Sequence, residues 1–261
     1  MLGKLMKYEF KSTWKILVPA NLLIVVMTFF ACVTVRLDFF SDIGSDGAVL
    51  GSVIIMLTYV LSMFVALVGT AIYLIYHFYT STYGDQGYLL HTLPVDKHHI
   101  IIAKVLVSLL WILLSSFLMY CSILFLFNLE EEIFTAFVDI MQFTLSMVGE
   151  EKYMAITIIM MFVAMIVEML ARVLKVAACI SLGQLSSNHK LLVAFAYYFG
   201  IYIIQQIIRG CYLIVLGIVV GKTGTFSLGA TWEFTLITGL IYSVAFYLIT
   251  WHVMDKQLNL D

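Results

Sequence analysis

Long apolar runs separated by short polar stretches make up most of this chain. Six of these runs are long enough to form membrane-spanning helices, at about 16–35, 48–80, 100–127, 153–182, 191–220 and 232–253. About 18 or more apolar residues can cross a bilayer as a helix, and a helix satisfies its own backbone polar groups, as lipid requires. The pattern therefore predicts an all-α membrane protein with six transmembrane helices.

The first polar stretch, residues 1–15, fits an amphipathic helix. At about 100° per residue, one side of this helix gathers Lys4, Lys7, Lys11 and Lys15. The opposite side gathers Leu2, Leu5, Met6 and Phe10. Such a helix favours lying in an anionic membrane surface, and a merely solvated basic leader is the alternative. Because the polar lead is long and no small-residue cleavage site follows it, we expect it to be retained.

The composition agrees with a membrane protein and excludes an ordinary soluble domain. Of 261 residues, 63% are hydrophobic and only 11% are charged, whereas a soluble domain needs more polar residues to cover its surface. The four cysteines lie in or at the ends of apolar runs and lack a Cys-x-x-Cys spacing. They are interpreted as small buried hydrophobic residues rather than as disulfides or metal ligands.

Six spans place both termini on one side of the membrane, and the charges predict which side. With cytoplasmic termini, the inner side receives ten basic residues: Lys4, Lys7, Lys11, Lys15, Lys97, Lys104, Arg172, Lys175, Lys190 and Lys256. The outer side receives three: Arg36, Lys152 and Lys222. Ten acidic residues also fall outside: Asp38, Asp42, Asp46, Glu130, Glu131, Glu132, Asp139, Glu150, Glu151 and Glu233. The positive-inside rule therefore predicts that both termini are cytoplasmic.

The longest polar interruption, residues 83–99, joins the second and third spans on the predicted cytoplasmic side. Its aromatic and glycine-rich part is Tyr83, Gly84, Asp85, Gln86, Gly87 and Tyr88, and Leu93 and Pro94 close it. At about 1.5 Å per residue the second span exceeds the roughly 30 Å hydrocarbon thickness, so it tilts or carries this loop away from lipid. We expect the loop to contact a partner in water. On the outer side, 133–148 is mostly apolar and predicts an interfacial or partly re-entrant helix.

Two spans carry stripes of polar or aromatic residues at helical spacing. The stripe on the fifth span is Tyr198, Tyr202, Gln205, Arg209 and Tyr212. The stripe on the second span is Tyr59, Ser62, Ala66, Gly69, Tyr73 and Tyr76. A charge facing lipid at the centre of a helix costs about 2.5 kcal/mol or more, so the fifth-span stripe is expected to face protein or water.

The fourth span adds a charged series with the same kind of spacing. Glu168, Arg172 and Lys175 are separated by four and three residues, so they share one face of the helix. Glu168 and Arg172 are predicted to form an i,i+4 ion pair. This pair either anchors the helix or acts as a gate that contacts substrate.

The sequence contains no convincing catalytic set. Gly217, Gly221, Lys222 and Thr223 approximate a phosphate-binding loop, but the gap between the glycines is one residue short and no strand precedes it. The two glycines are better interpreted as a small-residue step for helix packing. We therefore expect a non-enzymatic chain that binds no cofactor, metal or nucleic acid itself.

Several short motifs resemble the permease subunits of ABC-2-type ABC transporters, in particular the small bacterial six-span forms. The carriers of the resemblance are the segment from Tyr83 to Tyr88, the Leu93-Pro94-Val95 step, and Ile101, Ala103 and Lys104 at the start of the third span. The stretch from Ile180 to Leu185 and the closing Leu258 to Asp261 are also similar. The resemblance extends over essentially the whole chain, although the motifs themselves are short.

The resemblance implies an N-terminal elbow helix at 1–15 and a coupling helix between spans two and three that docks on an ABC ATPase. It also implies two permease protomers, which we expect to be a homodimer, above two ATPase subunits that bind the ATP and magnesium. The pathway would lie between protomers, lined chiefly by the second and fifth spans. Tyr59, Ser62, Tyr73, Tyr76, Tyr202, Gln205 and Arg209 are its candidates, with Glu168 and Arg172 as a possible gate.

The expected function is export across the bacterial plasma membrane, with amphipathic peptides as the cargo. An aromatic pathway and an acidic outer face would suit cationic amphipathic cargo. Two alternatives remain open: an ABC permease for lipid or drug-like substrates, and a secondary carrier that needs no motor. A secondary carrier would need inverted repeats with broken helices at the middle of the membrane. The two halves of this sequence show no convincing repeat.

Overall fold

The computed structural model describes residues 2–36, 45–84, 87, 96–127, 135, 139, 142, 151–186, 189–223 and 228–256. Six long helices occupy these ranges: α1 (Leu2–Arg36), α2 (Ser45–Tyr83), α4 (Lys97–Phe127), α6 (Glu151–Gly183), α7 (Lys190–Thr223) and α8 (Leu228–Lys256). The described residues contain no strand, and all six helices are long and apolar enough to cross a membrane. The predicted all-helical fold with six spanning helices is therefore confirmed.

The helices extend beyond the predicted spans at both ends, except α4, which ends at Phe127 as predicted. α2 has 39 residues, or about 58 Å at 1.5 Å per residue, which is well above the thickness of the hydrocarbon layer. α4 begins at Lys97, so His98 and His99 belong to a helix and not to the preceding loop. Of the predicted outer helix at 133–148, only Thr135, Asp139 and Gln142 are among the described residues.

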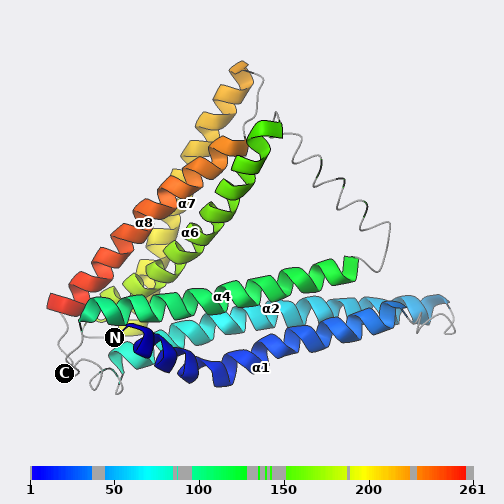
Figure 1. Ribbon diagram of the computed structural model, residues 1–261, viewed down its shortest axis with the longest axis horizontal. Helices are drawn as coiled ribbons and strands as arrows, with labels where there is room; N and C mark the ends of the chain where they lie inside the picture. The colour runs from blue at the N-terminus through cyan, green and yellow to red at the C-terminus, as the bar shows by residue number, and fades with distance from the viewer. Residues whose placement is uncertain are drawn as a thin grey trace. The chain divides into compact units, whose positions relative to one another are not determined.

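The N-terminal region forms one continuous helix where the sequence predicted two elements. Figure 1 shows that α1, drawn in blue, bends in its N-terminal half but does not break. Pro19 lies inside this helix and supplies a physical reason, because its ring clashes with the carbonyl of Lys15 and it cannot donate a backbone hydrogen bond. The predicted boundary after residue 15 is therefore a bend, and the elbow function stays a prediction.

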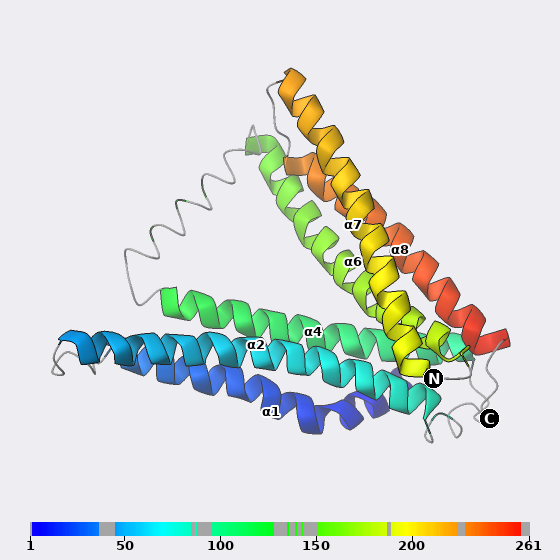
Figure 2. The same ribbon diagram turned by 180° about the vertical axis from the view of Figure 1, so that it is seen from behind.

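The helices divide into two compact units, and α2 and α4 contribute to both of them. The first unit comprises Met1–His77 and Leu106–Met141, in which α1, α2 and α4 lie side by side in both views (Figures 1 and 2). One apolar cluster holds Leu17, Leu74, Val107 and Trp111, and a second holds Ile24, Ala31, Tyr59, Met63 and Ala66. These clusters bury the interior sides of the three helices, while their other sides carry the exposed apolar residues expected of lipid-facing surfaces.

The second unit comprises Phe78–Val105 and Gln142–Asp261, and α6, α7 and α8 lie side by side within it (Figures 1 and 2). Its main cluster joins α4, α6 and α8 through Ile100, Ile101, Val105, Leu174, Ala178, Phe246 and Met254. α6 and α8 approach closely at Gly239, where an added Cβ would lie 3.0 Å from Cγ1 of Val167. α7 also packs on α6, but most of its side chains stay exposed.

Candidate functional site

A polar seam runs between α6 and α7 in the second unit. We define the seam as Glu168, Arg172 and Lys175 on α6, with Tyr198, Tyr202, Gln205 and Arg209 on α7. Nζ of Lys175 donates to Oε1 of Gln205 at 2.9 Å and lies 4.7 Å and 5.7 Å from the ring centres of Tyr198 and Tyr202. The predicted charged series of the fourth span and the predicted stripe of the fifth span therefore meet each other.

Glu168 joins the two helices through its carboxylate. Its Oε1 lies 3.1 Å from Nη2 of Arg209 and 3.4 Å from Nε of Arg172, which confirms the predicted ion pair with Arg172 and adds a second arginine. The Glu168 side chain is 17% exposed, whereas those of Arg209 and Arg172 are 47% and 66% exposed. The carboxylate is therefore enclosed, and both guanidinium groups keep an open side.

The open sides of the two arginines line a cavity of about 300 Å³. The cavity is completed by Met165, Met169, Trp232 and Thr235, so it combines charged and apolar walls. Glu168 and Arg172 lie near the middle of α6, and Arg209 lies near the middle of α7. Charges at this depth cost about 2.5 kcal/mol or more each when they face lipid, so they normally mark a functional site.

The residues of the second-span stripe do not share one environment, and Tyr59 is separated from the others. Tyr59 is 5% exposed and lies in the core of the first unit, whereas Tyr76 is 63% exposed. At about 100° per residue the two tyrosines differ by roughly 100° around α2, which explains why one is inside and the other outside. Ser62 and Tyr73 are half-buried, so Tyr76 is the most exposed pathway candidate on α2.

The burial of Tyr59 has a clear structural cause. Its hydroxyl lies 2.6 Å from Oγ of Ser122, which contacts Oγ1 of Thr28, and Thr28 donates to the carbonyl of Ile24. This chain of hydrogen bonds connects α2, α4 and α1 in a buried position. Tyr59 therefore stabilises the first unit, and its placement argues against the predicted pathway role.

The beginning of the predicted coupling segment is anchored to α6. The hydroxyl of Tyr83 bonds to Oγ of Ser181, and its ring packs edge-on against Phe78. An added Cβ at Gly84 would lie 2.6 Å from the backbone oxygen of Thr80, and one at Gly87 would collide with the backbone of Thr82. Both glycines are therefore needed for a close backbone approach. The other predicted coupling residues, Asp85, Gln86, Tyr88, Leu93 and Pro94, lie outside the described residues.

The far end of this segment is anchored to α8. Nζ of Lys97 lies 3.2 Å from Oδ1 of Asp255, and Nδ1 of His98 lies 2.6 Å from the hydroxyl of Tyr247. The His98 ring also stacks on Trp251 with 5.1 Å between the ring centres. Sequence reasoning missed these contacts, because His98 is about 150 residues from Tyr247 and Trp251, and no motif links the two regions. The segment between Gly84 and Lys97 is thus held at both ends by helices of the second unit.

Three further contacts between polar side chains, each buried or partly buried, were also missed. Lys104 is 4% exposed and donates to Oγ of Ser81 at 2.6 Å, although the sequence assigned it to the charged inner surface. In the first unit, Nε1 of Trp111 donates to Oγ1 of Thr13, and Nε2 of His77 lies 2.9 Å from Oε2 of Glu9. For Lys104 and Glu9, a charged residue in or beside an apolar stretch was the available signal. The partner of each residue could not be identified from the sequence.

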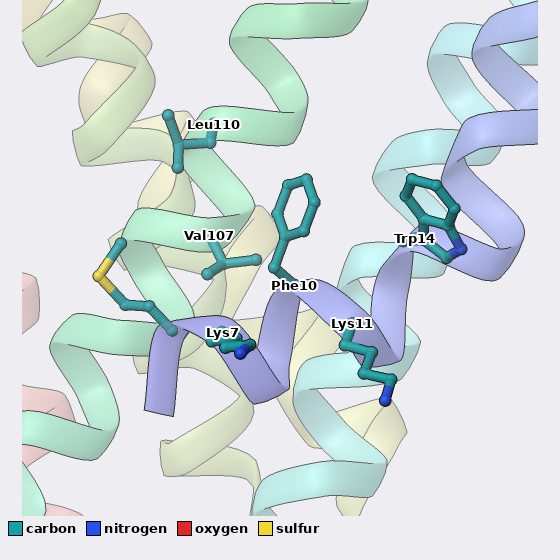
Figure 3. Close-up of a pocket in the computed structure, with 7 residues that line it drawn as sticks. Lys7, Phe10, Lys11, Trp14, Val107 and Leu110 are labelled. Atoms are coloured by element: carbon teal, nitrogen blue, oxygen red, sulfur yellow. The ribbon is translucent and has the colours of Figure 1, made fainter. Parts of the chain in front are cut away.

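The N-terminal part of α1 shows the predicted separation of charged and apolar residues. Lys4, Lys7, Lys11 and Lys15 are exposed, whereas Leu2, Leu5 and Met6 are half-buried. Figure 3 shows a groove beside this helix in which Phe10 and Val107 lie together between α1 and α4, with Leu110 beyond them. Phe10 also stacks on Trp111 with 4.9 Å between the ring centres. This end of α1 is therefore attached to the first unit by its apolar side.

Gly217 and Gly221 do not pack against any other helix in the described part of the chain. An added Cβ at either glycine would meet no atom within 4 Å, and both residues are exposed on α7. Tyr212, by contrast, is held by α8, since its hydroxyl donates to the carbonyl of Ala230 and its ring stacks on Phe234. The α7 stripe therefore has an anchored part and an exposed part.

Comparisons of the chain with family models, with curated proteins and with solved structures found no match. The functional argument therefore rests on the motifs of the sequence and on the geometry described above.

Proposed function

We propose that this chain is the transmembrane permease subunit of an ATP-binding-cassette exporter, driven by a separately encoded ATPase. The observation that carries the proposal is the anchoring of the segment between Gly84 and Lys97. Tyr83 ties its beginning to Ser181 on α6, and Lys97 and His98 tie its end to α8. A force applied to this segment from the cytoplasm would therefore act directly on the helices that carry and border the polar seam.

The proposed mechanism is the conversion of ATPase closure into a movement of helices. Two ATPase subunits would bind ATP and magnesium and push on the coupling segments of two permease protomers, which would rock against each other. The seam would then change its access from one side of the membrane to the other. Within it, Glu168 bridges α6 and α7 through Arg209, so a change in the spacing of the two helices would open or close the ion pair between Glu168 and Arg209.

The proposed location is the bacterial plasma membrane with both termini in the cytoplasm. The support for this orientation is the excess of lysine and arginine on the side that holds the termini. In this orientation the segment between α2 and α4 faces the compartment that contains ATP. The lysines on the exposed side of α1 would lie at the headgroups of the same leaflet.

The proposed substrate is an amphipathic molecule, with amphipathic peptides as the first candidate. The tyrosines and methionines of the seam and its cavity would accommodate apolar parts of such a molecule. A lipid or drug-like substrate is the second candidate. It is favoured by the positive excess of the seam, where Arg172, Lys175 and Arg209 face a single carboxylate.

Co-purification tests the proposed function. The tagged chain is expressed with a candidate ABC ATPase and isolated in mild detergent, and bound ATPase is quantified. Gly84→Ala forces the start of the segment away from Thr80 and is expected to reduce the bound ATPase. Gly69→Ala is the matched control, because an added Cβ there meets no atom within 4 Å. If no ATPase binds, or if both variants retain it equally, the assignment as an ABC permease fails.

A further inference from the structure

We propose that the cavity between α6, α7 and α8 binds the oxyanion headgroup of an anionic amphiphile, through Arg172 and Arg209. This inference rests on the proposed function, since it names the chemical class recognised at the seam of the transporter. The ligand carries a phosphate or carboxylate group joined to an apolar chain.

The first argument is the charge balance at the cavity wall. Glu168 is the carboxylate that lies within ion-pair distance of both arginines, and it contributes one negative charge against two positive charges. Lys175 stands one helical turn from Arg172 and adds a third cation, whose described contacts are an amide oxygen and two aromatic rings. The site is therefore positive in a region of low dielectric constant, and an anion would balance it.

The second argument is the placement of the hydrogen-bond donors. A guanidinium group has five N–H donors in a rigid fork, which matches the geometry of phosphate and carboxylate oxygens. The bonds of Arg209 to Glu168 use Nη2, and those of Arg172 use Nε and Nη2 over the longer distances of 3.4 and 3.5 Å. Both groups are about half exposed or more and line the cavity, so they have donors to offer to a ligand.

The third argument is the composition of the remaining walls. Met165, Met169 and Trp232 place flexible apolar and aromatic surface next to the arginines. A volume of about 300 Å³ is at the lower end of the range for small-molecule sites, which fits a headgroup with the first part of its chain. The rest of the chain would lie along the exposed apolar side chains of α7, such as Ile208 and Val215.

A direct titration tests this proposal on the purified chain without any ATPase. The protein is held in dodecyl maltoside micelles, and dodecyl phosphate is added while the fluorescence of Trp232 is followed, with Trp232→Phe as the spectroscopic control. Because the detergent has the same apolar chain and an uncharged head, a saturable response reports recognition of the charge. Sodium dodecanoate and inorganic phosphate are titrated in parallel.

The variants give opposite signs that a purely structural role would not produce. Arg172→Gln and Arg209→Gln are each expected to raise the half-saturating mole fraction about tenfold, which corresponds to about 1.4 kcal/mol. Glu168→Gln removes the competing carboxylate and is expected to lower it. Lys222→Gln, an exposed lysine of α7 outside the seam, is expected to leave it unchanged. Arg172→Gln is the primary variant, because the bonds of Arg172 to Glu168 are longer than that of Arg209 and their loss should disturb folding least.

Three results would overturn the proposal. The first is a half-saturating mole fraction that is the same in all variants. The second is weaker binding of dodecyl phosphate in Glu168→Gln as well as in Arg172→Gln, which would mean that the ion pairs only stabilise the packing of α6 and α7. The third is displacement of dodecyl phosphate by an equal concentration of inorganic phosphate, which would remove the requirement for an apolar chain. The lower of the half-saturating fractions for dodecyl phosphate and dodecanoate identifies the preferred headgroup. The titration contains no ATPase, so its result is independent of the co-purification. Binding of dodecyl phosphate to a chain that does not co-purify with an ATPase would contradict only the proposed function. Co-purification of an ATPase with a chain that does not bind dodecyl phosphate would contradict only this inference.

Discussion

The hydrogen bond between Tyr83 and Ser181 connects the end of α2 to α6, and the effect of removing it should be measurable. Ser181 is fully buried and donates its proton to the carbonyl of Ala177, so the Tyr83 hydroxyl is the donor to Oγ of Ser181. Tyr83→Phe removes the donor but leaves Ser181 its backbone contact. Ser181→Ala removes the acceptor and leaves the buried hydroxyl of Tyr83 without it.

The expected magnitudes follow from this asymmetry. A single hydrogen bond between helices in a membrane protein contributes about 0.6 kcal/mol on average and up to about 1.7 kcal/mol. Tyr83→Phe should therefore lower the free energy of unfolding by roughly 0.5–1.5 kcal/mol. Ser181→Ala should cost about 1–3 kcal/mol, because a buried polar group loses its partner. The interaction energy of the pair in a double-mutant cycle should be about 1 kcal/mol.

Unfolding in mixed micelles of mild detergent and sodium dodecyl sulfate measures these differences. Ser62→Ala is the matched control, because the hydrogen bond of this α2 serine among the described residues is to the carbonyl of Tyr59 on its own helix. It should change the free energy of unfolding by less than about 0.5 kcal/mol. Additive effects of Tyr83→Phe and Ser181→Ala would refute the claim that this pair connects the two helices.

Three further predictions concern other contacts of the chain. Thr13→Val leaves the buried N–H of Trp111 without its acceptor and should lower the free energy of unfolding by about 1–3 kcal/mol. Equal free energies of unfolding for variant and parent would contradict this prediction. Ser122→Ala should destabilise the chain more than Tyr59→Phe in the same unfolding assay, because Ser122 contacts both Thr28 and Tyr59. If Tyr59→Phe instead impairs transport more than stability, the result would support a role of Tyr59 in the pathway. His98→Ala removes the stacking on Trp251 and Tyr247 and should weaken the stimulation of ATP hydrolysis by substrate in the reconstituted complex. Stimulation at the parental level would contradict a role of His98 in transmitting force from the ATPase to α8.

The apolar pattern of the chain was sufficient to predict the six helices and the fold class, because a lipid environment leaves little choice of backbone structure. Local spacing was also sufficient for the ion pair of Glu168 and Arg172, since residues four apart meet on any helix. The lysine-bearing side of residues 1–15 was predicted for the same reason. In each case the prediction depends only on residues of one helix.

Contacts between helices could not be predicted in this way. Nothing in the local sequence links Glu168 to Arg209, Trp111 to Thr13 or Lys104 to Ser81, because each pair depends on how two helices are rotated against each other. The prediction that the α2 stripe forms one common face was wrong for a related reason. Its drift of roughly 100° between Tyr59 and Tyr76 exceeds the width of one packed side, so its two ends have different environments.

Site-specific photo-crosslinking tests the central claim most directly. A photo-reactive amino acid is placed at Leu93 in the proposed coupling segment and, as a control, at Leu213, which is 54% exposed on α7. After irradiation of intact membranes, the account predicts a crosslink from position 93 to an ATPase with nucleotide-binding motifs, and none to that protein from position 213. Absence of an ATPase crosslink at position 93, in membranes where the ATPase is expressed, would contradict the claim that this chain is driven through that segment.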